Sequence, residues 1–302
     1  MGNKIKIVAM FTYKQIITSV WFLILLLFNM AVGFIATQPQ ILVNFFSTEQ
    51  VESITSQEIA QVEGSITIED VKLTVAMVVM CVLFILTVLY GTSLANSVVE
   101  EKGARIIETL LCYVKPLELF AGKLIGFVCG MITQMLFFWG FRLILLQTMG
   151  EKLKENSLFQ IVTSFLNTRI VVYIIGMMLF GFLFYAVILM AMASFTDSVQ
   201  NSTALIMPVT MTMLATFYTS LYCAMHTGVA WANLVSYLPF FSTSMSFVVI
   251  DFEKITWGEV IVRLLVQVIE VGIFTIFCSK LYKRGVVSYG AKNLFKRTAL
   301  KK

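Results

Sequence analysis

Long apolar runs alternate with short polar segments along most of the chain. Six runs reach the roughly 20 residues that a helix needs to cross the hydrocarbon core of a bilayer. They cover residues 16–36, 71–96, 117–146, 169–195, 204–225 and 259–281. This pattern predicts an all-α membrane protein, with residues 1–302 forming a single transmembrane domain of six transmembrane helices.

The N-terminal segment 1–15 precedes the first span and mixes basic with apolar positions. Lys4, Lys6 and Lys14 alternate there with isoleucine, valine and methionine. Such an amphipathic stretch favours an interfacial elbow helix that leads into the membrane. The following apolar run is too long for the core of a secretory signal peptide, and we therefore expect it to be the first span.

The segment 96–117 is the one substantial charged stretch between two long apolar runs. Glu101 and Arg105 are four residues apart and Glu108 follows three residues later, so a helix would place all three on one face. Ala104, Ile107 and Leu111 would form a separate apolar face. The pattern predicts an amphipathic helix that ends before Pro116. Such a helix either is simply solvated at the interface or docks a soluble partner.

Two further polar segments interrupt the spans. Residues 37–70 hold six acidic side chains and no lysine or arginine, which predicts a short acidic external segment. It is either a solvated loop or a vestibule that attracts cations. Residues 226–258 are aromatic but broken by glycine, proline and serine, and we expect two short re-entrant helices there, near 229–238 and 242–250.

Composition and charge support a membrane protein and set its orientation. Hydrophobic residues make up 59 % of the chain and charged residues 13 %, too few to cover a soluble core. Of the 22 lysines and arginines, 15 lie in three regions. These are the N-terminal segment, the charged segment together with the start of the third span, and the basic tail, which includes residues 282–302. By the positive-inside rule these parts are cytoplasmic, both termini included. The tail is basic enough to lie on anionic membrane lipid.

A few polar side chains fall inside the predicted spans. The candidate intramembrane charges are Arg142, Arg263 and Glu270, and a carboxylate near mid-membrane needs a partner. Arg263, two turns from Glu270 on the same face, and Arg142 of the third span are the candidates. The pair is either structural or part of a proton or ion relay. Threonines of the fifth span, Thr212, Thr216 and Thr219 among them, either satisfy backbone groups freed by Pro208 or line a polar path.

Residue types needed for catalysis or cofactor binding are not arranged in recognisable sets. The pair Gly122-Lys123 lacks the upstream glycine and the following hydroxyl residue of a phosphate-binding loop. The five cysteines are scattered and the single His226 has no metal-ligand spacing to them. We therefore expect no enzyme activity, no metal and no bound cofactor in this chain, and nothing indicates nucleic-acid binding.

The charged segment resembles the central motif of ABC type-2 transporter permeases, in particular the branch that extrudes sodium and peptides. The matching residues are Ser97, Glu100, Glu101, Lys102, Arg105, Glu108, Leu110, Leu111, Pro116, Gly122, Lys123 and Gly126. The segments 237–247 and 280–292 resemble the proline-aromatic segment and the tail of the same branch. The first seventy residues carry little of the resemblance.

The resemblance implies the membrane subunit of an ATP-driven exporter. ATP and Mg would then bind to a separate ABC ATPase, present in two copies, and a second permease chain would complete a homodimer or a heterodimer. Residues 96–117 would form the cytoplasmic coupling loop, with Glu100, Glu101, Lys102, Arg105, Glu108 and Leu111 contacting the ATPase. The protein would lie in the plasma membrane of a bacterium.

Three alternatives for the activity stay open. The cargo is either an amphipathic small molecule or peptide, favoured by the aromatic and methionine-rich spans, or a small cation such as sodium. A membrane immunity or sensor protein that works without ATP is the third. The sequence does not distinguish a homodimer from a heterodimer.

Overall fold

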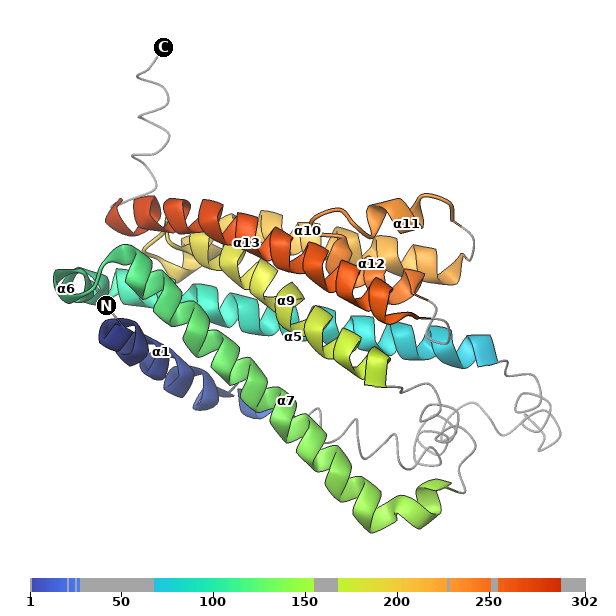
Figure 1. The fold of residues 1–302 in the computed structure, drawn as a ribbon. Helices are drawn as coiled ribbons and strands as arrows, with labels where there is room; N and C mark the ends of the chain where they lie inside the picture. The colour runs from blue at the N-terminus through green and yellow to red at the C-terminus, as the bar shows by residue number, and fades with distance from the viewer. Residues whose placement is uncertain are drawn as a thin grey trace, which may run out of the picture.

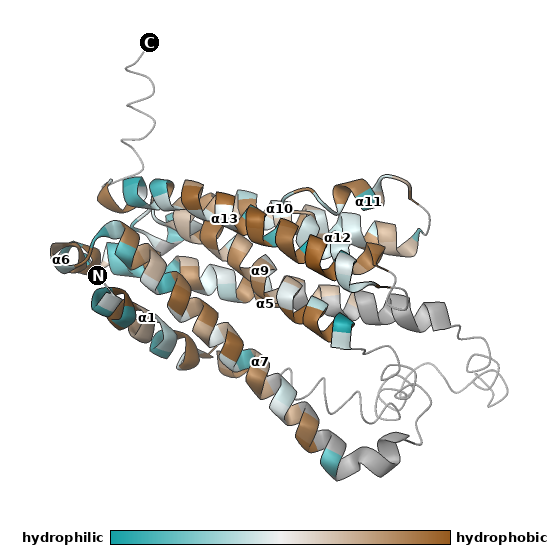
Figure 2. Ribbon diagram, in the orientation of Figure 1, coloured by the Kyte–Doolittle hydropathy of each residue, from teal (hydrophilic) through white to brown (hydrophobic). Residues whose placement is uncertain are grey.

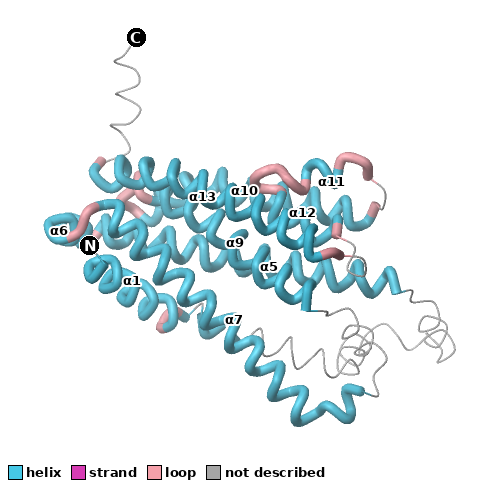
Figure 3. Tube along the Cα trace, in the orientation of Figure 1, coloured by secondary structure: helices cyan, strands magenta, loops and turns pink. Residues whose placement is uncertain are grey.

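A computed structural model describes residues 2–20, 22–24, 26–27, 68–154, 168–226, 229–250 and 255–288. Within these ranges the regular structure is helical and no strand occurs (Figure 3). The helices are α1 (Gly2–Ile17), α5 (Ile68–Gly103), α6 (Ile106–Tyr113), α7 (Pro116–Lys154), α9 (Thr168–Ala193), α10 (Val199–Met225), α11 (Ala232–Val235), α12 (Ser242–Val249) and α13 (Trp257–Val287).

Four of the described helices are long and apolar enough to cross a membrane. These stretches are Pro116–Phe141, Thr168–Ala193, Gln200–Met225 and Trp257–Val287, and they coincide with the last four predicted spans. The second predicted span falls on α5. The first lies largely outside the described residues, as do the acidic segment 37–67 and the tail beyond residue 288. The described part of the chain is thus all-helical and has the character of a multi-pass membrane protein, and the count of six spans stays a prediction.

Two helices continue beyond the apolar runs that predict them. The third predicted span ends at residue 146, and α7 continues to Lys154. The sixth predicted span ends at residue 281, and α13 continues to Val287, with Tyr282 and Val286 buried against the rest of the bundle. In both places a helix extends beyond its apolar run, since the helical backbone needs no apolar side chains to continue.

The long helices lie side by side and their ends form two distinct regions. α9 packs between α5 and α13, while α1 packs along α7 (Figure 1). α6, the start of α1 and the last turn of α13 lie at one end, here called the α6 end, and α11 and α12 lie towards the other (Figure 1). Hydrophilic residues gather at the α6 end, whereas the middles of the helices are mainly hydrophobic (Figure 2).

Glycines bring α1 and α7 into close contact. Gly122, Gly126 and Gly130 recur every fourth residue and therefore line one face of α7. A side-chain carbon at Gly126 would lie 2.5 Å from the carbonyl oxygen of Ala9, so only glycine permits this approach. Small residues in a helix interface allow such close packing in a membrane. The segment 1–15 is thus helical as predicted, and its placement at the membrane surface stays a prediction.

The segment 226–258 contains two short helices within the predicted ranges, and their re-entrant placement in the membrane stays a prediction. α11 and α12 lie within the expected ranges 229–238 and 242–250. Phe240, between them, has a φ of 71°, an unfavourable backbone conformation for a bulky residue. Its carbonyl oxygen accepts a hydrogen bond of 2.8 Å from the hydroxyl of Tyr185, and its ring packs edge-on against Phe184. These contacts with α9 hold the strained turn in place.

Candidate functional site

The charged segment does not form the single amphipathic helix that its spacing predicts. α5 continues to Gly103, and α6 begins only at Ile106. Between them Arg105 has a φ of 59°, in the left-handed region, which ends the first helix and turns the chain. Glu101, Arg105 and Glu108 therefore do not share a helix face. Gly103 permits this geometry, because a side-chain carbon there would lie 2.5 Å from the carbonyl oxygen of Asp197.

The six residues of this segment expected to contact a partner fall into two groups. Glu100, Arg105 and Glu108 are exposed, and Leu111 is half-buried. Glu101 and Lys102 are only 8 % and 2 % exposed, so they face the interior of the bundle. A charged run that looks uniform in the sequence thus has an outer part, available to a partner, and an inner part, which holds helices together.

The inner carboxylate belongs to a buried ion pair between α5 and α7. The ammonium group of Lys123 lies 2.6 Å from Oε1 of Glu101 and donates a second hydrogen bond, of 3.3 Å, to the hydroxyl of Ser97. Lys123 is 1 % exposed. An unpaired charge in this position would be strongly destabilising, so the two residues depend on each other.

The inner lysine of α5 connects the ends of two other helices. The ammonium group of Lys102 donates hydrogen bonds to the carbonyl oxygens of Ser194 at 2.7 Å, Gly285 at 2.7 Å and Ser288 at 2.8 Å. These carbonyls lie at the C-terminal ends of α9 and α13, where free acceptors and the helix dipole both favour a cation. Burial lowers the pKa of Lys102, and the carboxylate of Asp197 acts in the opposite direction.

α6 presents an exposed surface beside this buried network. Ile107 is buried and anchors the helix, whereas Ile106 and Tyr113 are largely exposed, and Leu117 follows at the start of α7. The ammonium group of Lys4 donates a 2.6 Å hydrogen bond to the carbonyl oxygen of Tyr113, so the start of α1 also contacts this helix. The exposed residues mix apolar side chains with both signs of charge, which suits a protein partner.

The prediction that Arg263 pairs with Glu270 is wrong. Oε2 of Glu270 accepts a 2.6 Å hydrogen bond from the hydroxyl of Ser242, at the start of α12. Arg263 instead donates to the hydroxyl of Ser236 at 3.1 Å, and its guanidinium lies 5.0 Å from the ring centre of Tyr237. These two polar side chains of α13 thus both contact the segment that contains α11 and α12. The side chain of Arg142 lies outside the described residues.

The threonines of α10 bond mainly to their own helix. Thr212 donates to Pro208, Thr216 to Met213 and Thr219 to Ala215, each through a backbone carbonyl oxygen. None of these three bonds reaches the carbonyl oxygen of Ala204, the acceptor that Pro208 leaves without its backbone N–H donor, so the satisfaction of freed backbone groups and the polar path both stay predictions.

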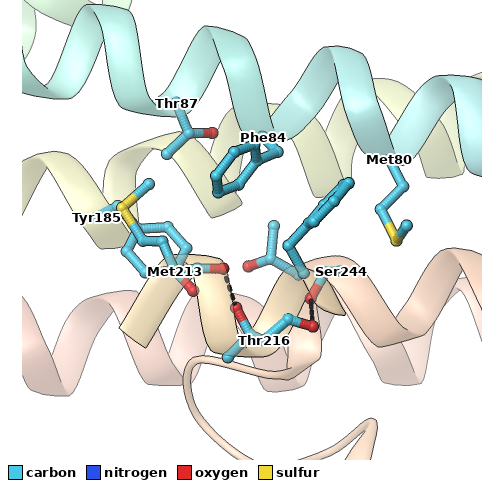
Figure 4. Close-up of a pocket in the computed structure, with 9 residues that line it drawn as sticks. Met80, Phe84, Thr87, Tyr185, Met213, Thr216 and Ser244 are labelled. Atoms are coloured by element: carbon cyan, nitrogen blue, oxygen red, sulfur yellow. Dashed lines mark hydrogen bonds between the residues drawn. The ribbon is translucent and has the colours of Figure 1, made fainter. Parts of the chain in front are cut away.

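Thr216 also lines a cavity of about 30 Å³ together with Tyr185, Met213 and Ser244 (Figure 4). That volume holds one or two water molecules, too little for an amphipathic cargo.

Sequence reasoning missed the residues that make the α6 end rigid. Ser97 and Lys123 were noticed only as motif positions, and nothing in the local pattern connects them to Glu101, 22 residues from Lys123. The four-residue spacing of Gly122, Gly126 and Gly130 could have indicated a close helix contact. Cys112 and Cys129 are exposed, whereas Cys223 and Cys278 are buried.

Comparison with known proteins gives one family match and two distant relatives. The family model described as ABC-2 family transporter protein matches residues 36–279. The uncharacterised protein YhaP of Bacillus subtilis is 24 % identical over 242 residues, covering 78 % of this chain and 57 % of the relative. The uncharacterised protein MJ1024 of Methanocaldococcus jannaschii is 24 % identical over 204 residues, covering 68 % and 47 %. The chain spans about half the length of these relatives. No solved structure shows significant similarity to it.

Proposed function

Since the chain belongs to the ABC-2 family of transporter proteins, we propose that it is the permease subunit of an ATP-driven exporter. Members of this family are membrane transport components that normally work with an ABC ATPase. In this proposal ATP and Mg bind to two copies of a separate ATPase subunit, and a second permease chain completes the pathway. The α6 end faces the cytoplasm, in accordance with its basic residues.

The observation that carries the proposal is the construction of α6. It is a short helix set apart from α5 by the turn at Arg105, with Ile107 inserted into the bundle and Ile106, Glu108 and Tyr113 on the outside. A helix that is anchored on one face and exposed on the other suits a groove on a soluble partner. We therefore assign ATPase docking to the exposed residues and not to Glu101 or Lys102.

The buried residues give a route for force from the ATPase into the membrane. α6 begins at Ile106, directly after the short turn that follows the end of α5 at Gly103, so a movement of α6 also displaces that end of α5. Lys102 connects that end to α9 and α13, and the Glu101–Lys123 pair connects it to α7. Because the connections are short and buried, the helix ends move together instead of flexing separately. In this mechanism the inner charges transmit motion and the outer ones select the ATPase.

The cargo class that we propose is an amphipathic small molecule or peptide that enters from the inner leaflet. Extrusion of a small cation is less well supported, since Glu270 is hydrogen-bonded to Ser242 and the cavity beside Thr216 is small.

A pull-down of the tagged, detergent-solubilised chain from its native host tests the docking assignment. We expect an ABC ATPase in a one-to-one ratio with the wild type and a strong loss of it with Arg105→Glu or Glu108→Arg. The control Lys283→Glu reverses the charge of an exposed residue of α13 at the α6 end and should leave the recovery of the ATPase unchanged. Normal recovery from both the Arg105 and the Glu108 variant would refute docking on α6 and the turn before it. Isolation of the chain without any ATPase would favour the ATP-independent sensor or immunity role.

A further inference from the structure

A small polar cluster is buried where α12 meets the middle of α13. Ser242 and Thr243 begin α12, and Gln267 and Glu270 lie three residues apart on one face of α13. None of the four residues is more than 7 % exposed. The hydroxyl of Ser242 donates to Oε2 of Glu270 at 2.6 Å, and Nε2 of Gln267 donates to the hydroxyl oxygen of Thr243 at 3.1 Å. Two adjacent residues of α12 thus bind two polar side chains of α13.

Each of the two α13 side chains keeps one buried oxygen without a hydrogen-bond partner. These atoms are Oε1 of Gln267 and Oε1 of Glu270. The amide oxygen is an acceptor, and so is the carboxyl oxygen as long as Glu270 is ionised. Two acceptors cannot bond to each other, and a buried acceptor without a donor is destabilising. Because residues three apart on a helix are neighbours, one proton on Oε1 of Glu270 would supply the donor that both atoms lack.

No cation neutralises Glu270 among the residues that the structure describes around it. α10 and α12 carry no charged residue. On α13, Arg263 is the closest charged residue along the helix, and it donates to Ser236. On α9, Arg169 donates to the carbonyl oxygen of Ile255, and the titratable hydroxyl of Tyr185 donates to that of Phe240. The charged side chain of α7 that faces the bundle, Lys123, is paired with Glu101 near the α6 end.

The cluster therefore suits a neutral carboxyl group better than a charged one. An ionised carboxylate without a cation is expensive inside an apolar span, and one hydroxyl donor does not compensate for it. We propose that Glu270 is protonated in this structure and that its O–H donates to the amide oxygen of Gln267. Turning the amide of Gln267 around would pair the same positions through an N–H donor, but it would leave the negative charge buried and without a counter-ion.

The proton holds α12 against α13. When it leaves Oε1 of Glu270 for a water molecule, a carboxylate remains that needs hydration, and the dry contact with Ser242 and Gln267 becomes unfavourable. Loss of the proton thus favours separation of α12 from α13. α12 lies towards the end of the bundle opposite α6 (Figure 1), so the site connects the position of this segment to the pH. The site does not depend on the proposed exporter function.

Infrared difference spectra of the purified chain in nanodiscs test the protonation directly. A protonated carboxyl group has a carbonyl stretching band that is separate from the bands of ionised carboxylates and moves in D₂O. At neutral pH we expect one such band in the wild type that Glu270→Gln lacks. The control Glu108→Gln, which changes an exposed carboxylate on α6, should keep it. Gln267→Met removes the amide oxygen at similar side-chain length and should shift the band, because the O–H loses its acceptor.

The pH dependence of stability is an independent readout. The proposed native state keeps a proton that the unfolded chain releases, so raising the pH should destabilise the wild type. Glu270→Gln does not titrate, and the unfolding equilibrium constant of the wild type should rise relative to it by up to about tenfold per pH unit. Parallel pH curves for the two proteins, the lack of a carboxyl band at neutral pH, or a band that Gln267→Met leaves unshifted would overturn the proposal. Neither measurement needs an ATPase, so the proton site and the exporter proposal succeed or fail separately.

Discussion

Replacing Lys102 by methionine removes one charge and three hydrogen bonds while keeping an unbranched chain of similar length. Lys102 is 2 % exposed, and its ammonium group bonds to carbonyl oxygens at the ends of α9 and α13, 92 to 186 residues away in the sequence. The substitution therefore disconnects α5 from two helices at once. It leaves the apolar packing of the aliphatic stem largely intact.

The expected loss follows from opposing contributions. A hydrogen bond to a charged group contributes about 1.5–3 kcal/mol, which would give three such bonds several kcal/mol together. Removing the ammonium also removes its desolvation cost of several kcal/mol. Changes that leave buried polar partners unsatisfied cost about 3–5 kcal/mol in total, and we expect Lys102→Met to fall in this range. At about 2 °C per kcal/mol for a large domain, the apparent melting temperature should fall by roughly 6–10 °C.

Thermal unfolding of the detergent-solubilised chain, followed by size-exclusion chromatography of heated samples, measures this difference. The matched control is Lys115→Met, which removes an exposed lysine close to the same helix end and should change stability by no more than about 0.5 kcal/mol. Its backbone N–H, which donates to Glu118, is unaffected. Equal melting temperatures for the two variants would show that Lys102 does not hold the helix ends together.

Two further predictions test the helix contacts. Gly126→Ala should destabilise the chain by about 1–3 kcal/mol, because the new methyl group would meet the carbonyl of Ala9. The control Gly140→Ala, with open space around it, should stabilise the chain by up to about 1 kcal/mol. Melting temperatures that change equally in the two variants would refute the close contact. Glu270→Gln should be tolerated, because the amide oxygen still accepts a hydrogen bond from Ser242. Glu270→Leu leaves that hydroxyl without its partner and should reduce stability by about 1–3 kcal/mol. A leucine variant with wild-type stability and transport would remove any role for the carboxyl group.

The sequence alone determined the features that depend on local composition. Apolar runs of sufficient length predicted the four spans that the structure bears out, and interruptions by proline and serine located α11 and α12 correctly. These predictions succeeded because the length of an apolar helix and the residues that end it are properties of neighbouring residues. The family likeness likewise depended on a contiguous charged motif.

Only the tertiary structure decided what the charged side chains do. Glu100 and Glu101 are adjacent, yet one is exposed and the other forms a buried pair with Lys123. The periodicity of a continuous helix put Glu101 on the same face as Arg105 and Glu108, and the left-handed backbone at Arg105 invalidates that assumption. Lys102 finds its acceptors on α9 and beyond, and Glu270 finds Ser242 instead of Arg263. A buried charge takes whichever partner the packing of distant helices brings near, and local periodicity carries no information about that packing.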